Sequence, residues 1–286
     1  MEETLKKSSV TKRDWLVSLA SMVVFAVLYA SLFQSQAKGL VFTLLILSHE
    51  AGHWLYFRKI GIDPEPPLFI PFVGALIKIS TKLKPDDEVK GSLAGPFLGG
   101  IGVAALLAFC LLTENKQLYQ LIQIGVFINL LNLVPLAPLD GGRVAIQLTK
   151  KLFWLGVAVM IVVIIMQNWL LLPFLLVHIL QYSEVRPLWQ GIARTAMFWT
   201  GGFLLFNQLN WYHPVTIPIA LIIGGLSGGM MYFANREDQH YEEVPTTATK
   251  QDKLIWSCYY LVTALFLITL LLLAVHFKPL LTAKDI

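Results

Sequence analysis

The sequence predicts an all-α polytopic membrane protein with eight or nine transmembrane helices. Hydrophobic residues make up 56% of the 286 residues, charged residues make up only 14%, and the mean hydropathy is +0.65. Soluble globular domains carry about 25% charged residues. A helix that crosses the hydrocarbon core needs about 20 mostly apolar residues. The apolar stretches that approach or exceed this length are 14–33, 39–58, 92–112, 117–136, 152–183, 192–209, 212–234 and 253–277, of which 152–183 is long enough to form two helices.

The first predicted helix, 14–33, follows a charged stretch and shows no cleavage site with small residues, so we expect an uncleaved anchor. If the N-terminus faces the cytoplasm and there are nine helices, most lysines and arginines also face the cytoplasm, as the positive-inside rule expects. The exceptions are Lys38, Lys116, Lys278 and Lys284. The basic residues are scattered over loops and form no stripe with interleaved aromatic residues, so nucleic acid is not an expected partner.

The second predicted helix, 39–58, carries the motif HEAGH, in which His49, Glu50 and His53 interrupt an apolar run. Ionisable side chains inside a bilayer are costly unless they are paired or bound, so a transmembrane segment that keeps three of them has a functional reason. His49 and His53 are four residues apart and project from one face of a helix, a spacing that allows both rings to bind one zinc ion. Glu50 lies beside them and can exchange protons with zinc-bound water.

A polar, proline-rich stretch, 61–91, separates the second and third predicted helices. Within it, LFIPFVGALIKIS is apolar but too short to cross a bilayer, most of its residues favour strands, and Gly74 marks a tight bend. We therefore expect a short re-entrant β-hairpin at 68–80. Non-helical backbone at membrane depth needs protein or a water-filled cavity to satisfy it, which indicates a polar chamber nearby.

The fourth predicted helix, 117–136, leads into the sequence PLAPLDGGR, which contains Asp140. Pro135 and Pro138 end the helix, and the two glycines after Asp140 leave the backbone free to turn inward. A catalytic zinc needs a third protein ligand and an open position, and Asp140 is the candidate. The alternative is that Asp140 only caps the next helix. We predict one zinc ion per chain, held by His49, His53 and Asp140.

The chain divides into four regions by composition and motif content. Residues 1–38 form the N-terminal anchor, and residues 39–143 hold the dense motifs. Residues 144–183 are a pair of apolar segments, and residues 184–286 are three further apolar helices with a polar cytoplasmic loop.

The region 39–143 resembles the site-2 proteases, a family of intramembrane zinc metalloproteases, here in a compact form. The likeness is carried by HEAGH at 49–53, PFVGA at 71–75, AGP at 94–96, and NLVP at 132–135 leading into PLDGGR at 138–143. No PDZ-like insertion and no C-terminal CBS domain accompany these motifs.

The resemblance implies that His49, His53 and Asp140 bind zinc, that Glu50 is the catalytic base, and that Asn132 helps to hold the substrate. It implies hydrolysis of transmembrane protein substrates near the cytoplasmic side of the membrane. A substrate helix must unwind before attack, and the edge of the expected hairpin, which includes Gly74 and Ile77, offers a strand with which it could pair.

The sequence leaves some expectations open. We expect an integral protein of a bacterial plasma membrane, with an organellar membrane as the alternative, and a regulatory membrane partner. The competing interpretation of the motifs is a non-proteolytic relative that acts as a membrane scaffold or a zinc-binding transporter. A scaffold is expected to lose a ligand or the base, whereas all four residues are present, and a transporter favours repeated halves, which the sequence lacks.

Overall fold

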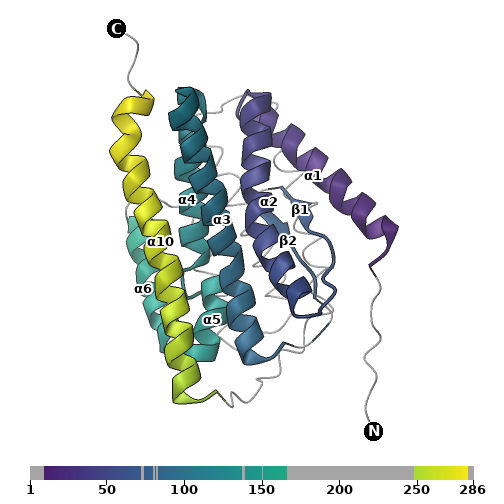
Figure 1. Cartoon of the computed structure of the whole chain (residues 1–286), viewed down its shortest axis with the longest axis vertical. Helices are drawn as coiled ribbons and strands as arrows, with labels where there is room; N and C mark the ends of the chain where they lie inside the picture. The colour runs from purple at the N-terminus through teal and green to yellow at the C-terminus, as the bar shows by residue number, and fades with distance from the viewer. Residues whose placement is uncertain are drawn as a thin grey trace.

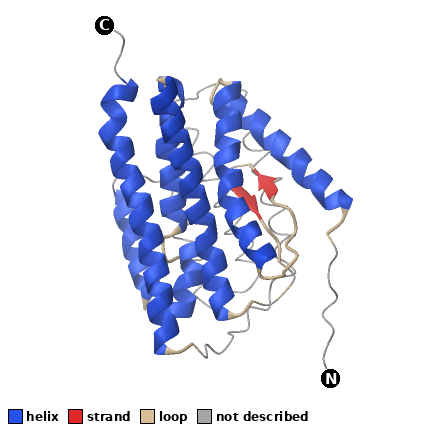
Figure 2. Ribbon diagram, in the orientation of Figure 1, coloured by secondary structure: helices blue, strands red, loops and turns tan. Residues whose placement is uncertain are grey.

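The structure is a computed structural model, and it is mostly helical (Figure 2). The residues that it describes are 10–71, 74–79, 81, 83–136, 139–149, 151–165 and 248–282. The helices in this part of the chain are α1 (Lys12–Leu32), α2 (Gln36–Lys59), α3 (Pro85–Thr113), α4 (Tyr119–Asn132), α5 (Asp140–Leu148), α6 (Leu152–Ile165) and α10 (Lys250–Thr282), with a 3₁₀ turn at Lys116–Leu118.

The expectation of eight or nine transmembrane helices is not supported. Within the described residues, three helices are long and apolar enough to cross a membrane: α1, α3 and α10. Helix α2 has sufficient length but is less apolar, since it carries the HEAGH motif. Helix α4 has only 14 residues, because it ends before Pro135. The predicted helices at 192–209 and 212–234, and the second half of 152–183, lie outside the described residues.

Helices α2, α3, α4 and α10 lie roughly along one direction, and α1 leans against α2 at an angle (Figure 1). The chain passes down α2, up α3 and down α4, so consecutive helices are antiparallel neighbours. Helix α3 lies at the centre of the bundle, since it packs against α2, α4, α5 and α10. Two segments far apart in the sequence, α2 and α5, are thereby both held against the same helix.

The predicted β-hairpin between the second and third helices is present. Strand β1 (Leu68–Ile70) pairs with the antiparallel strand β2 (Gly74–Leu76), with Phe69 opposite Ala75. Gly74 has a φ of +116°, a conformation that glycine adopts readily and other residues rarely do. Ile77 follows the paired strand instead of lying in it, so its assignment to the strand was wrong.

Helix α1 covers the outer side of β1. The Ser18 hydroxyl donates to the Pro67 carbonyl at 2.6 Å, and the Phe69 amide donates to the Ser21 hydroxyl at 3.0 Å. Phe25 packs its ring against Phe69. These contacts leave β2 as the strand whose outer edge has no further strand beside it in the described sheet.

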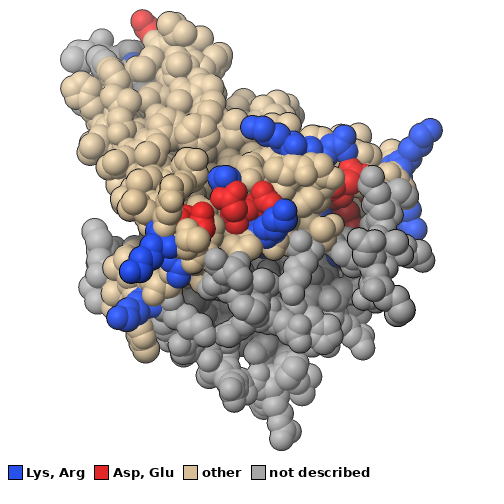
Figure 3. All heavy atoms as spheres, turned by 60° about the horizontal axis from the view of Figure 1, so that its bottom comes forward, with Lys and Arg blue, Asp and Glu red and all other residues tan. Residues whose placement is uncertain are grey.

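Basic residues gather at one end of the bundle, where α2 ends and α3 and α10 begin (Figure 1). Figure 3 shows lysine, arginine and acidic side chains in a band on this end, next to a surface that carries few charges. The start of α2, the 3₁₀ turn before α4 and the end of α10 lie at the opposite end (Figure 1), and these segments contain Lys38, Lys116 and Lys278. The separation fits the positive-inside rule, and the side of the membrane that each end faces stays a prediction.

Candidate metal centre

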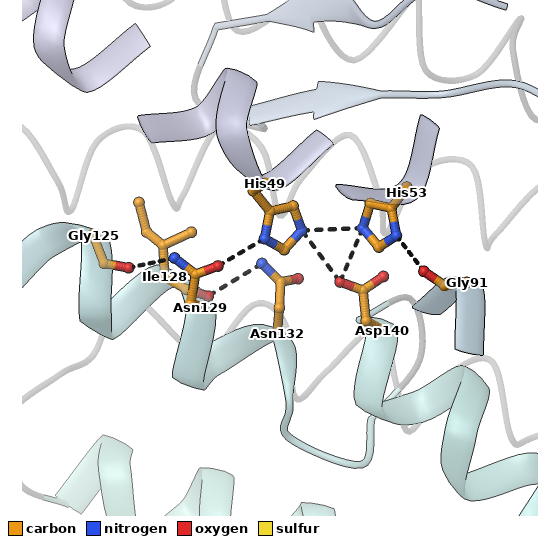
Figure 4. Close-up of polar contacts among 8 residues, drawn as sticks. All are labelled: His49, His53, Gly91, Gly125, Ile128, Asn129, Asn132 and Asp140. Atoms are coloured by element: carbon orange, nitrogen blue, oxygen red, sulfur yellow. Dashed lines mark hydrogen bonds and ion pairs between the residues drawn. The ribbon is translucent and has the colours of Figure 1, made fainter. Parts of the chain in front are cut away.

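Three side chains converge in the interior of the bundle: His49 and His53 from α2, and Asp140 from the first position of α5 (Figure 4). The two Nε2 atoms are 3.2 Å apart, and Asp140 Oδ2 is 3.2 Å from His49 Nε2 and 3.4 Å from His53 Nε2. His49 is only 5% exposed, and His53 and Asp140 are largely buried. Among the described residues, this is the group of histidine, cysteine or acidic side chains placed to hold a metal ion.

The outer nitrogens of both rings have defined partners. His49 Nδ1 lies 2.9 Å from Asn129 Oδ1, and Asn129 Nδ2 donates to the Gly125 carbonyl at 2.8 Å, which orients the amide with its oxygen toward the ring. His53 Nδ1 lies 2.8 Å from the Gly91 carbonyl. Both partners are acceptors, so they favour the tautomer that carries the proton on Nδ1, and in the neutral rings both Nε2 atoms present lone pairs.

The centre therefore contains three lone-pair atoms that face one another. Asp140 Oδ2 is buried, and the polar atoms nearest to it are the two Nε2 atoms. Three lone pairs that face one another are unfavourable unless a proton or a metal ion lies between them. Zinc binds imidazole nitrogen and carboxylate oxygen at about 2.0–2.1 Å in tetrahedral geometry, which places the ligand atoms about 3.3 Å from one another. The observed separations of 3.2–3.4 Å fit this geometry, so the donor set suits zinc.

Glu50 lies next to His49 in α2 and is 8% exposed. Its carboxyl group is close enough to His49, Asp140 and Arg143 for their charges to act on it. It contributes none of the three converging atoms. This placement, beside the candidate ligands and outside their set, is the one that a proton-transfer group requires.

Glycines allow α3 to lie directly against the histidine face of α2. A Cβ atom on Gly52 would lie 2.1 Å from the Ala94 carbonyl oxygen, and one on Gly95 would lie 2.1 Å from His53 Nε2. A Cβ atom on Gly99 would lie 2.1 Å from Asn129 Oδ1. The glycines of the HEAGH and AGP motifs are therefore explained by close packing around the metal centre.

The first turn of α3 joins the two helices that carry the candidate ligands. The Tyr56 hydroxyl, one turn after His53, donates to Asp87 at 3.1 Å. Arg143, one turn after Asp140, lies 3.7 Å from Glu88. These links fix α2 and α5 relative to each other at the charged end of the bundle.

The remaining predicted residues lie at different distances from the centre. Asn132 lies near the metal centre, between Asn129 and Asp140 in Figure 4, and its amide donates to the Ile128 carbonyl of its own helix at 3.1 Å. Gly74 and Ile77 belong to the hairpin region, whose strand β2 packs against α2. Their roles in holding a substrate stay predictions.

Asn129 is a site residue that the sequence analysis missed. It is polar and almost fully buried in an apolar helix, and the argument applied to HEAGH would have identified it. The Gly91 carbonyl was also missed. It could not have been found, because a backbone acceptor leaves no signal in the residue type.

Replacing Asn129 with leucine is expected to weaken zinc binding by roughly 10- to 100-fold, the usual effect of removing the partner of a metal-binding histidine. The isosteric hydrophobic side chain leaves His49 Nδ1 without an acceptor. Zinc affinity measured by competition with a chelator, in the absence of substrate, checks this. Asn132→Leu is the matched control, because its amide bonds within α4. Equal affinities for the two variants would contradict the role given to Asn129.

Comparison with known proteins finds a partial similarity to one curated protein. A protein of Methanocaldococcus jannaschii named as a zinc metalloprotease is 27% identical over 142 residues, which is 48% of this chain. The matched segment covers 41% of that relative. No protein-family model and no solved structure matches the chain. The matched relative is named as a zinc metalloprotease, and in this chain His49, His53 and Asp140 could hold a metal ion. The apolar helices indicate membrane association.

Proposed function

We propose that this chain is an intramembrane zinc metalloprotease of the site-2 type, which hydrolyses peptide bonds of transmembrane protein substrates. The observation that supports this most is the buried triangle of lone-pair atoms from His49, His53 and Asp140, set among helices that are long and apolar enough to cross a membrane. Glu50 adds a proton acceptor beside the three candidate metal ligands. A scaffold protein would not need this group, whereas hydrolysis does, so its presence favours the hydrolase.

The depth of the centre follows from helix geometry. His53 and His49 precede the end of α2 at Lys59 by six and ten residues, which corresponds to roughly 9 and 15 Å along the axis. The hydrocarbon core is about 30 Å thick. With Lys59 taken at the membrane surface, these distances support a centre within the membrane, nearer the basic end of the bundle. The positive-inside rule assigns that end and the N-terminus to the cytoplasm.

The chemistry divides between the metal and the chain. A zinc ion held by His49, His53 and Asp140 would supply a Lewis acid for the scissile carbonyl and would lower the pKa of a bound water toward neutral pH. Glu50 accepts the proton of the attacking water on its carboxylate and returns it to the amide nitrogen, so that the C–N bond breaks as the amine leaves. Asn129 and the Gly91 carbonyl hold the two histidine rings in the tautomer that leaves each Nε2 free to bind.

An extended substrate strand is proposed to lie along the open edge of β2. Helix α1 covers the other side of the hairpin, and β2 packs against the helix that carries His49 and His53. Peptide groups of an unwound substrate helix would find backbone partners there. Asn132, Gly74 and Ile77 are the proposed contacts.

Disrupting this edge is expected to reduce cleavage more than zinc binding. Ile77→Pro removes a backbone donor just after β2 and should raise KM for a transmembrane substrate several-fold, with zinc content unchanged. Cleavage rates over a range of substrate concentrations in vesicles check this. Unchanged KM and kcat would remove the hairpin from substrate binding.

The function itself is tested by reconstituting the full chain in lipid vesicles with a panel of tagged single-span substrates. Cleavage that a zinc chelator stops and added zinc restores is the expected result. Zinc flux, followed in the same vesicles with an enclosed zinc-sensitive dye, tests the transporter alternative. Flux without cleavage across the panel would favour that alternative.

A further inference from the structure

The C-terminal helix α10 packs against α3, α4 and α5, although it lies more than a hundred residues after the candidate metal ligands (Figure 1). It is anchored by polar contacts at several levels. The Trp256 indole donates to Asp86 at 2.9 Å, and the Tyr119 hydroxyl donates to the Ala274 carbonyl at 2.8 Å. A helix that served only to fill the lipid-facing surface would not need these contacts.

One of the anchors reaches the turn that presents Asp140. The Tyr260 hydroxyl donates to the carbonyl of Leu133, where α4 has just ended. The same carbonyl touches the residue that follows Asp140, because a Cβ atom on Gly141 would lie 2.1 Å from the Leu133 oxygen. Tyr260 and the start of α5 therefore meet at one peptide group.

A second anchor, one helical turn away on the same face of α10, contacts the first turn of α3. Trp256 binds Asp86, and the next two residues of α3 hold the helices that carry the ligands, through Tyr56 and Arg143. Together the two contacts connect α10 to both segments that supply donor atoms.

We propose that Tyr260 is a positioning residue for the metal centre: it holds the turn after α4 so that Asp140 points at the two histidines. Asp140 is the one candidate ligand that follows an irregular segment, whereas His49 and His53 are fixed by a continuous helix. Its position therefore depends on what holds that segment. This proposal rests on the proposed zinc site.

The test compares Tyr260→Phe with Tyr259→Phe in the purified full chain. Both substitutions remove one hydroxyl and keep the ring. Tyr259 is the preceding residue in α10, and its side chain is 46% exposed. Zinc affinity, measured by competition with a chelator, should fall roughly 3- to 10-fold for Tyr260→Phe, as the loss of one ordinary hydrogen bond predicts. Tyr259→Phe should bind zinc as the wild type does.

Introducing Asp140→Ala into the wild-type chain and into the Tyr260→Phe chain separates positioning from a general structural effect. If Tyr260 acts through Asp140, its substitution has no further effect on the weak zinc binding of the Asp140→Ala chain. A loss of the same size in both backgrounds would overturn the proposal, as would equal affinity for Tyr260→Phe and wild type. A wild type that binds no zinc would instead remove the proposed function, and the positioning role with it.

Discussion

Glu50→Gln is expected to abolish peptide hydrolysis while zinc stays bound. The amide has the same shape as the carboxyl group but cannot accept the proton of the attacking water. Loss of a general base costs roughly 10²–10⁴-fold in rate. Zinc remains because Glu50 supplies none of the three converging atoms. Cleavage rate and zinc content measured on the same preparation check both halves of the prediction.

The matched control is Glu114→Gln, which makes the same chemical change at the far end of α3. It should leave both cleavage and zinc unchanged. Retained turnover in Glu50→Gln would remove Glu50 as the base. Lost zinc in that variant would instead make it a ligand or a support for one.

Asp140→Ala is expected to lower zinc affinity by two orders of magnitude or more. The substitution removes one of three protein donors and leaves two imidazoles that bind the ion with water in the remaining positions. Elemental analysis should find about one zinc per wild-type chain and far less in the variant after the same purification. Asp63→Ala is the control, because Asp63 pairs with Arg58 away from the centre. Equal zinc in wild type and Asp140→Ala would break the three-ligand assignment.

The parts of the site that the sequence predicts are those with local geometry. His49 and His53 lie on one helical face by their spacing alone. Asp140 follows from its position at a helix break that Pro135 creates. The hairpin follows from a short apolar, strand-favouring run bent at Gly74. Each of these inferences needs only neighbouring residues.

The parts that were missed depend on long-range packing. Asn129 and Asn132 lie three residues apart in α4, and which of them faces His49 depends on the rotation of that helix, fixed by the contact of Gly99 with Asn129. The contact of Tyr260 with Leu133 joins segments 127 residues apart. Neither contact can be recognised from the residue types or from their spacing in the sequence.

The predicted number of transmembrane helices is not supported within the described residues, and this has a physical reason as well. Apolar composition extends beyond the end of α4 at Asn132 into a segment that turns back through Leu133–Leu136, because the backbone there presents Asp140. Hydropathy measures transfer into lipid and does not detect where a helix ends. The polar side chains of the metal centre likewise lower the apolarity of α2 even though it packs at the centre of the bundle beside α3.

The measurement that tests the central claim most directly is X-ray absorption at the zinc edge on purified wild-type protein. The account predicts four-coordinate zinc with two imidazole nitrogens and oxygen for the rest, at about 2.0–2.1 Å, and no sulfur. His49, His53 and Asp140 would supply three of these donors. Sulfur ligands, six-coordinate zinc or a protein without zinc would contradict it.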